Sequence, residues 1–366
     1  MNRLQEVDAK HALIRAVLDK RNADGLWFQR TRNIAWMTAG ADASIPIDSE
    51  TGVYSVLVTR EHRMIFTPNN EQPRLRQEEL LEELGFELQP FDWFRLNHPL
   101  ENQSMRRALV PSERIITDTD AEPELWELRI QLMEPEQIRY RALGFDAAAA
   151  LEEAISATRR GDSEWQIAAR LDAAARQRGG LAVVNLVAVD DRINRFRHPL
   201  ITDKQVTERV MMVLCMRRGG LIAAATRFAQ FGSIPAALMD KARRVAFIDV
   251  TAMNASTPGR TLNDVFTEIQ AAYTAVGEDG QWRHQHQGGL IGYDTRERLA
   301  KPGDGSVIPL GGACAWNPSI VGISSEDTIV IGENGFEILT AASENFPAIA
   351  VEIDGKTIRR PGILEL

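Results

Sequence analysis

The stretch Ala225-Thr226-Arg227-Phe228, with Phe231-Gly232 after it, lies between two segments that predict the same order of elements. In each segment a polar turn precedes a helix, and two strand-like runs follow the helix. The first has Arg160-Gly161-Asp162, a helix over 163–178 and strands over 183–189 and 210–216; the second has Pro258-Gly259-Arg260, a helix over 261–276 and strands over 288–293 and 313–316. Two such halves predict a pseudo-symmetric domain with a site where the halves meet.

A change of character near residue 133 predicts a domain boundary. Residues 1–132 alternate short runs rich in Val, Ile, Phe and Trp with helical stretches, among them a charged helix over 77–84, and this is an α/β pattern. From Pro135, a residue type that suits the first turn of a helix, apolar residues recur at helical spacing. We therefore expect an α/β (α+β) chain with two domains, 1–132 and 133–366.

Composition restricts the partners and the location that we expect. The 366 residues carry a net charge of -9, which argues against a nucleic acid or an anionic membrane as the main partner. The longest apolar runs, such as 210–216, are too short to cross a bilayer, and the first residues fit an amphipathic helix rather than a signal peptide. The only cysteines, Cys215 and Cys314, lie in apolar runs and predict buried reduced thiols, which fits a cytoplasmic protein.

Four segments carry a resemblance to a known family. They are the stretch 225–232, Pro258-Gly259 with Asp264-Val265-Phe266, Gly292-Tyr293-Asp294-Thr295-Arg296-Glu297, and Gly322-Ile323-Ser324-Ser325-Glu326-Asp327-Thr328. In this order and at these distances they resemble the pita-bread fold of prolidase, aminopeptidase P, methionine aminopeptidase and creatinase. Residues 1–132 resemble the N-terminal domain of the prolidase and creatinase branch. The resemblance implies a homodimer in which the partner's N-terminal domain helps to close the site.

The peptidases of this family bind two metal ions through two Asp, one His and two Glu side chains. Bridging carboxylates offset the charge of two dications and hold a shared hydroxide. The resemblance places Val213 and Ala224 at the two Asp positions, Gly289 at the His position and Asn317 at the first Glu position, so only Glu326 matches. We therefore expect no metal and no other cofactor.

The sequence His284-Gln285-His286-Gln287-Gly288-Gly289 offers two alternative metal ligands. His286 stands three positions before Gly289, and on a strand an odd offset points to the opposite face unless a bulge intervenes. A single zinc ion on His284, His286 and Glu326 stays open as a formal alternative. Otherwise the two histidines hydrogen-bond neighbouring glutamine or backbone groups, or relay protons.

His198 is the main candidate for proton transfer. Creatinase is the family's metal-free precedent, in which one histidine transfers the proton and glutamates hold the guanidinium-like substrate. The segment that carries this histidine resembles residues 190–199, and His198 matches it. A histidine suits this role because its pKa lies near working pH. The alternative interpretation is a polar loop residue among arginines, with no role.

Other residues are candidates for substrate contact, and each has a structural alternative. Arg296 replaces the family's substrate-side histidine, and it either binds a substrate carboxylate in a bidentate way or neutralises Glu326. Glu326 either holds water or a cationic group, or keeps a contact of the fold. Arg227 matches a family position, which is more often structural. Tyr293 and Trp316 either line the pocket or pack in the core.

The expected site therefore has His198, Glu326 and His286 as catalytic groups, and Arg296, His284, Asn317, Tyr293, Trp316 and Arg227 as substrate contacts. This set suits a metal-independent, creatinase-like enzyme that uses acid–base catalysis on a small amide, amidine or amino-acid-like molecule, with hydrolysis of a C–N bond as the expected step. Two alternatives stay open: a metal-dependent Xaa-Pro dipeptidase or aminopeptidase, and a catalytically inactive pita-bread binding protein.

Overall fold

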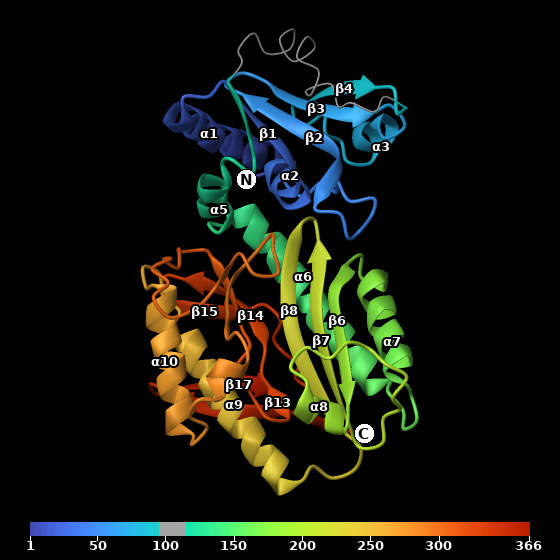
Figure 1. Cartoon of the computed structure of the whole chain (residues 1–366), viewed down its shortest axis with the longest axis vertical. Helices are drawn as coiled ribbons and strands as arrows, with labels where there is room; N and C mark the ends of the chain where they lie inside the picture. The colour runs from blue at the N-terminus through green and yellow to red at the C-terminus, as the bar shows by residue number, and fades with distance from the viewer. Residues whose placement is uncertain (95–113) are drawn as a thin grey trace. The chain divides into compact units, whose positions relative to one another are not determined.

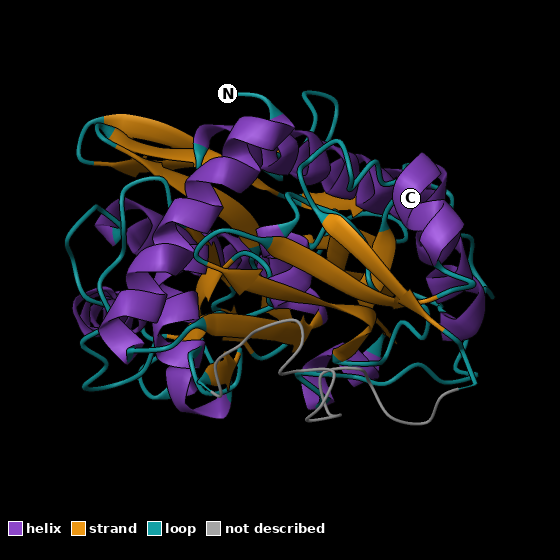
Figure 2. Ribbon diagram, turned by 90° about the horizontal axis from the view of Figure 1, so that it is seen from above, coloured by secondary structure: helices purple, strands orange, loops and turns teal. Residues whose placement is uncertain are grey.

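The computed structural model describes residues 1–94 and 114–366. Within them the chain forms two compact units, one of residues 1–129 with 133–136 and the other of residues 130–132 with 137–366. Helices and strands occur in both units (Figures 1 and 2), so the predicted α/β (α+β) class is confirmed. Among the described residues, no helix is both long and apolar enough to pass through a bilayer.

The first unit is built around a mixed five-stranded sheet in the order β4-β3-β2-β1-β5. The pairs β1–β2 and β2–β3 are antiparallel, whereas β3–β4 and β1–β5 are parallel. The strands are β1 Gly25–Arg30, β2 Thr51–Thr59, β3 Arg63–Pro68, β4 Glu87–Phe91 and β5 Ile115–Thr117, and the helices are α1 Arg3–Arg21, α2 Thr31–Met37, α3 Gln72–Gln77 and α5 Glu122–Arg129. The β-branched and aromatic residues of β2 and β3 are mostly buried, which is the environment that favours these types in strands.

Two sequence predictions meet different outcomes in this unit. The predicted N-terminal helix is present as α1, although its buried side includes the charged Glu6 and Lys10. Asn2 and Gln5 close its first turn with a reciprocal capping box. The predicted helix over 77–84 is wrong, because α3 ends at Gln77. The reason is that Leu80 adopts a left-handed backbone with a φ of 56°, a conformation that a right-handed helix does not contain.

The second unit contains two halves, each with helices and a sheet. The first half has most of α6 Glu134–Ser156, α7 Glu164–Gln177, α8 Asp191–Arg195, β6 Leu181–Val189, β7 Arg209–Arg218 and β8 Leu221–Gln230; the second has α9 Ala236–Ala255, α10 Leu262–Ala275, the 3-10 turn η1 Gln281–His284, β9 Gly288–Ile291, β10 Arg298–Leu299, β11 Ala313–Trp316, β12 Ser319–Ile320, β13 Ile323–Ser324, β14 Asp327–Gly332, β15 Gly335–Ile338, β16 Ala348–Ile353, β17 Lys356–Pro361 and β18 Ile363–Glu365. The first sheet has the order β18-β8-β7-β6 and the second the order β10-β9-β11-β14-β15.

The two halves repeat each other closely at their polar turns. The N-caps Ser163 of α7 and Thr261 of α10 each form a reciprocal capping box. The glycines before them, Gly161 and Gly259, both have a φ of 87°, and each donates a backbone hydrogen bond of 2.9 Å to a loop of its own half. Glycine adopts this left-handed conformation without strain, which explains its place in both turns. The predicted pseudo-symmetry is therefore present down to single hydrogen bonds.

The halves meet along β8 and β14, which Figure 1 shows beside each other. The backbone N–H of Thr226 donates to the Glu326 carbonyl (3.1 Å). The Thr328 hydroxyl donates to the carbonyl of Ala224 (3.0 Å) and accepts from its N–H (2.8 Å). Because these bonds fix the two sheets at one seam, side chains beside the seam come from both halves.

A buried ionic network supports the seam. Arg227 pairs with Asp327 (3.1 Å), and Arg360 pairs with both Asp249 (2.5 Å) and Asp327 (2.8 Å), with every side chain at most 1% exposed. Burial raises the pKa of Asp249 to about 6, although Arg360 acts in the other direction. The expected substrate contact of Arg227 is therefore corrected: this guanidinium lies in the core.

Candidate functional site

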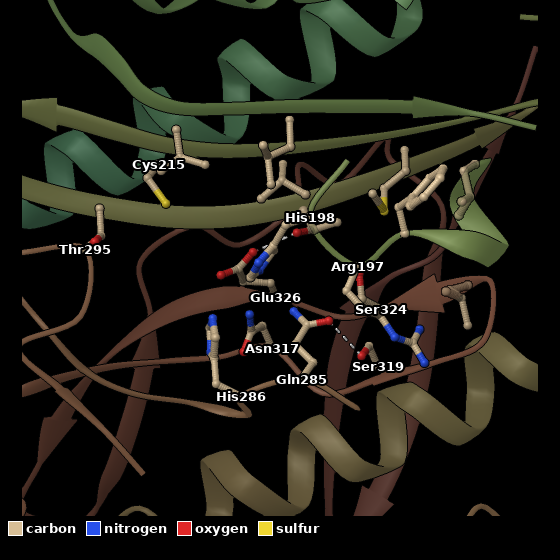
Figure 3. A pocket seen from close by; sticks show the side chains of 18 of the residues that line it. Arg197, His198, Cys215, Gln285, His286, Thr295, Asn317, Ser319, Ser324 and Glu326 are labelled. Carbon is tan, nitrogen blue, oxygen red and sulfur yellow. Dashed lines mark hydrogen bonds between the residues drawn. The ribbon is translucent and has the colours of Figure 1, made fainter. Parts of the chain in front are cut away.

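A cavity of about 320 Å³ lies next to the seam (Figure 3). One wall is apolar and is formed by side chains of β6 and β7, namely Val184, Leu186, Met211, Val213 and Cys215. The other lining side chains are mostly polar and come from both halves, among them His198, Thr226, Gln285, His286, Arg296, Asn317, Ser319 and Glu326. Five of the nine predicted site residues are thus brought together: His198, His286, Arg296, Asn317 and Glu326.

Glu326 is bound through both of its carboxylate oxygens. Arg296 Nη2 donates to Oε1 (2.7 Å), and the Thr226 hydroxyl donates to Oε2 (2.8 Å). The side chains of Arg296 and Glu326 are only 13% and 4% exposed, so water screens their ion pair weakly. Of the two interpretations of Arg296, the structure contains the pairing with Glu326.

His286 reaches the cavity because Gln287 fixes the loop before β9. The Gln287 amide nitrogen donates to the carbonyls of Trp282 (3.2 Å) and Gln285 (2.7 Å), and its oxygen accepts from the Tyr273 hydroxyl (2.8 Å). β9 begins only at Gly288, so the face alternation of a strand does not extend back to His286. The glutamine, rather than the histidines, makes the local hydrogen bonds.

His198 and His286 face each other with ring centroids 5.5 Å apart. Burial lowers the pKa of His286 to about 4, and the positive charge of Arg296 and the His198 ring add to this effect. His286 is therefore neutral at pH 7, and its buried Nδ1 has no hydrogen-bond partner among the described residues. His198 lies in the exposed loop after α8, and its ring likewise makes no hydrogen bond with the described part of the chain.

Asn317 adds a second unsatisfied polar atom to the cavity. Its backbone N–H donates to the Gln287 carbonyl (3.1 Å), whereas its side-chain Oδ1 is buried without a partner among the described residues. Buried polar atoms are normally hydrogen-bonded. Oδ1 is an acceptor, so a ligand that satisfies it must bring an N–H or O–H group.

Three predicted contacts lie away from the cavity and are corrected here. His284 ends the turn η1 and is exposed. Trp316 is fully buried, and its indole N–H donates to the Ser256 hydroxyl (2.9 Å) beside the end of α9. Tyr293 is 3% exposed and packs in the core. Trp316 and Tyr293 thus follow the core-packing alternative, because burying a large aromatic surface away from water lowers the free energy more than lining a polar site does.

Solved structures of known proteins have the same architecture. The prolidase from Pyrococcus horikoshii OT3 superposes with a TM-score of 0.73 and 18% sequence identity, over 92% of this chain and 99% of that chain. The Xaa-Pro dipeptidase from Bacillus anthracis gives a TM-score of 0.73 and 17% identity, over 93% and 99%. The chain has the pita-bread fold.

The pita-bread architecture is shared at still lower sequence identity. The N-terminal domain of the FACT complex subunit SPT16 from Cicer arietinum (chickpea) is similar with a TM-score of 0.65 and 11% identity, over 93% of this chain and 97% of that chain. No protein-family model and no curated protein sequence matches the chain significantly.

The residues that the resemblance places at the family's metal positions do not fit a two-metal centre. Val213 and Ala224 lie on one face of the first sheet. Cys215 is two residues after Val213 on β7 and so lies on the same face, and its partner across to β8 is Ala224. Neither side chain has a donor atom. At Gly289 an added Cβ would lie 2.1 Å from the Arg298 carbonyl oxygen, so no histidine fits there.

A single zinc ion does not fit the pita-bread cavity either. Of its three proposed ligands, His284 is exposed outside the cavity, and Glu326 already binds Arg296 and Thr226. In residues 1–94 and 114–366, no three His, Cys, Asp or Glu side chains come close enough together to hold a metal ion.

The two thiols are free and buried, as predicted. Burial raises the pKa of both Cys215 and Cys314 to about 12. A thiol with such a pKa is protonated at pH 7 and is a poor nucleophile. Cys215 therefore contributes an apolar surface to the cavity and no covalent chemistry.

Sequence reasoning did not single out six polar residues of the cavity: Arg197, Thr226, Gln285, Thr295, Ser319 and Ser324. Thr226 was quoted only as part of a family segment, and its hydroxyl turns out to hold Glu326. Arg197 directly precedes His198, so adjacency was the one available signal. Gln285 accepts a hydrogen bond from the Ser319 hydroxyl (3.1 Å), a contact between distant segments that no local pattern announces.

Proposed function

We propose that the protein is a metal-independent hydrolase that cleaves a C–N bond in a small amide or amidine by acid–base catalysis. The observation that supports this most is the pair His198 and His286, whose ring centroids lie 5.5 Å apart on a small cavity. The similar structures named prolidase and Xaa-Pro dipeptidase agree with a C–N hydrolase.

In this proposal His198 transfers the proton. It accepts a proton from the water molecule whose oxygen bonds to the carbonyl or amidine carbon, and it returns that proton to the leaving nitrogen as the C–N bond breaks. His286 is neutral and serves as a hydrogen-bonding partner of the substrate. Oδ1 of Asn317 and Nε–H of Arg296 have no hydrogen-bond partner in the described part of the chain. In the proposal Oδ1 accepts a substrate N–H, and Nε–H donates to the oxygen or nitrogen on which negative charge develops.

The test uses protein kept in chelator and a panel of N-acyl, N-carbamoyl and N-amidino compounds, with release of amine or ammonia as the readout. We expect turnover that falls about 100-fold or more in His198→Ala, the usual contribution of a general acid–base group. His284→Ala is the matched control, because this histidine is exposed outside the cavity and its loss should leave turnover unchanged. Equal turnover of His198→Ala and the parent protein would remove His198 from the mechanism.

The Xaa-Pro peptidase alternative has weaker support. It needs carboxylates where Val213 and Ala224 stand, and these side chains are apolar. Assays of the same protein with Xaa-Pro dipeptides and added Mn²⁺ or Co²⁺ separate the two cases. Turnover that appears only with added metal would overturn the metal-independent proposal.

A catalytically inactive binding protein is the second candidate function, and one observation favours it. Arg296 already neutralises Glu326, so the protein's own side chains satisfy much of the charge of the site. One similar structure is a domain of a FACT complex subunit. This candidate predicts a cavity that binds ligands without turning any of them over, whereas the hydrolase proposal requires product release.

A further inference from the structure

The apolar wall of the cavity is one face of the sheet that β6, β7 and β8 form. Side chains directly opposite each other on paired strands lie on the same face, and so do side chains two residues apart on one strand. The strand pairing gives two rows across the three strands: Val184, Cys215 and Ala224 in one, and Leu186, Val213 and Thr226 in the next. Thr226 has the only hydroxyl of these rows, and it donates to Glu326 Oε2 (2.8 Å). The wall therefore offers a ligand hydrocarbon surface rather than hydrogen bonds.

The two faces of β7 differ in how well they are covered. Met212, Leu214 and Met216 lie on the face away from the cavity and are fully buried. Val213 on the cavity face is partly exposed, although β7 is an inner strand with β6 and β8 on its two sides. Alkyl surface that stays in contact with water favours the binding of an apolar group, because removing such surface from water lowers the free energy.

The opposite side of the cavity is polar. Figure 3 shows Cys215 on one side, and Gln285, His286 and Asn317 on the other. Burial lowers the pKa of His286 to about 4, so this ring is uncharged at pH 7. A ligand that matches both sides has a hydrogen-bonding group at one end and a hydrocarbon group at the other.

We infer that the apolar wall binds a hydrocarbon group of the substrate and so selects amides or amidines with an alkyl or aryl group on the carbon of the scissile bond. This inference rests on the proposed function for the scissile group, whereas the apolar site rests on the wall itself. The hydrocarbon group packs on Leu186 and Val213, and the amide or amidine group lies at His286 and Asn317.

The same residues explain why this site belongs to this chain in particular. The resemblance places Val213 and Ala224 where the peptidases of the family have metal-binding carboxylates. Two carboxylates on the wall would repel a hydrocarbon group, because burying a charge against an apolar group is costly. With alkyl groups at both positions, the wall accepts the apolar end of a substrate in their place.

The test measures the binding of three uncharged probes: acetamide, butyramide and hexanamide. The unfolding midpoint at increasing probe concentration gives an apparent Kd for each probe. We expect the Kd for the parent protein to fall about 4-fold for each added methylene, which is the gain from moving a CH₂ group out of water. Ammonia release in the same samples reports turnover independently of binding.

Val213→Thr tests the position of the hydrocarbon group, because it keeps the branched shape of the side chain and places a hydroxyl on the wall. It should weaken the binding of hexanamide about 5-fold and that of acetamide less than about 2-fold. Val183→Thr is the matched control, since Val183 is a partly exposed valine of β6 that does not line the cavity. It should bind every probe as the parent protein does.

The chain-length series on the parent protein tests the inference without any substitution. A Kd that does not change with chain length, or no binding of hexanamide, would overturn it. Equal Kd values for hexanamide in Val213→Thr and the parent would overturn the placement on this wall. Failure of the proposed hydrolase shows up separately, as graded binding of the amides without release of ammonia.

Discussion

At the scale of single residues, the glycine pair that begins β9 leaves no room for a side chain at either position. An added Cβ would lie 2.0 Å from the Ala315 carbonyl oxygen at Gly288, and 2.1 Å from the Arg298 carbonyl oxygen at Gly289. The strands on both sides approach so closely that no side chain fits between them. The histidine of this site comes instead from the loop, as His286. The resemblance places Gly289 at the position of the family's metal histidine, and the steric contact that excludes a side chain there is visible only in three dimensions.

Gly289→Ala should destabilise the second unit by about 3 kcal/mol or more, because it adds a clash with backbone to a φ of 150° that other residues rarely adopt. Gly305→Ala is the control, since an added Cβ there meets no atom within 4 Å. Thermal unfolding midpoints of the two variants and the parent check this. Equal midpoints for both variants would contradict the steric argument.

The pKa of His286 makes a prediction about acid stability. Its folded-state pKa is about 4, against about 6.5 in an unfolded chain. Between these values the unfolded chain binds more protons, so the free energy of unfolding falls as the pH drops from about 6.5 to 4. The groups that face His286 are Arg296, His198 and Glu326. Arg296 and His198 oppose a positive charge on the His286 ring, which adds to the effect of burial.

Denaturant unfolding of His286→Asn between pH 4 and 7 tests this. The variant lacks the titrating ring, so its stability should change less with pH across this window than that of the parent. His62→Asn is the control, because this histidine is exposed in the first unit. Parallel curves for His286→Asn and the parent would show that burial does not depress the pKa of His286.

At the scale of elements, the network below the seam connects β8, β14, α9 and β17. Arg360→Met leaves Asp249 and Asp327 buried without this cation, although Asp327 keeps Arg227. Removing one partner of a buried pair typically costs about 3–5 kcal/mol. We expect a loss of that size in thermal unfolding, and none in the control Arg359→Met, whose side chain is exposed on the same strand. A stable Arg360→Met protein would indicate that the carboxylates take up protons at little cost.

Elements with local signals were predictable, and loops fixed by distant contacts were not. The helices over 163–178 and 261–276 are present as α7 and α10, because capping boxes and apolar periodicity lie within a few residues of each other. The loop before β9 depends on bonds from Gln287 to Tyr273 and Trp282. No periodicity encodes such bonds, so the direction of His286 could not be derived from a strand offset.

At the scale of the whole molecule, the order of four short segments was enough to predict the pita-bread fold, while the walls of the cavity were not predictable. Trp316 and Arg227 are the direct chain neighbours of Asn317 and Thr226, yet they point into the core. Neighbours in a strand face opposite sides, and only the packing of the two halves tells which side encloses space.

The packing of the two halves also predicts how the stability of the protein responds to metal ions. A tightly bound metal stabilises a folded chain, by about 2.7 kcal/mol at a free concentration of 100 times its Kd. The described residues offer no group of three ligands, so we expect chelator and added Zn²⁺, Mn²⁺ or Co²⁺ to change the unfolding midpoint by less than about 1 °C. Elemental analysis of protein purified without chelator should give well under one metal ion per chain. A stoichiometric metal whose removal lowers the midpoint by several degrees would contradict this, because Val213, Ala224 and Gly289 offer no ligand at the seam.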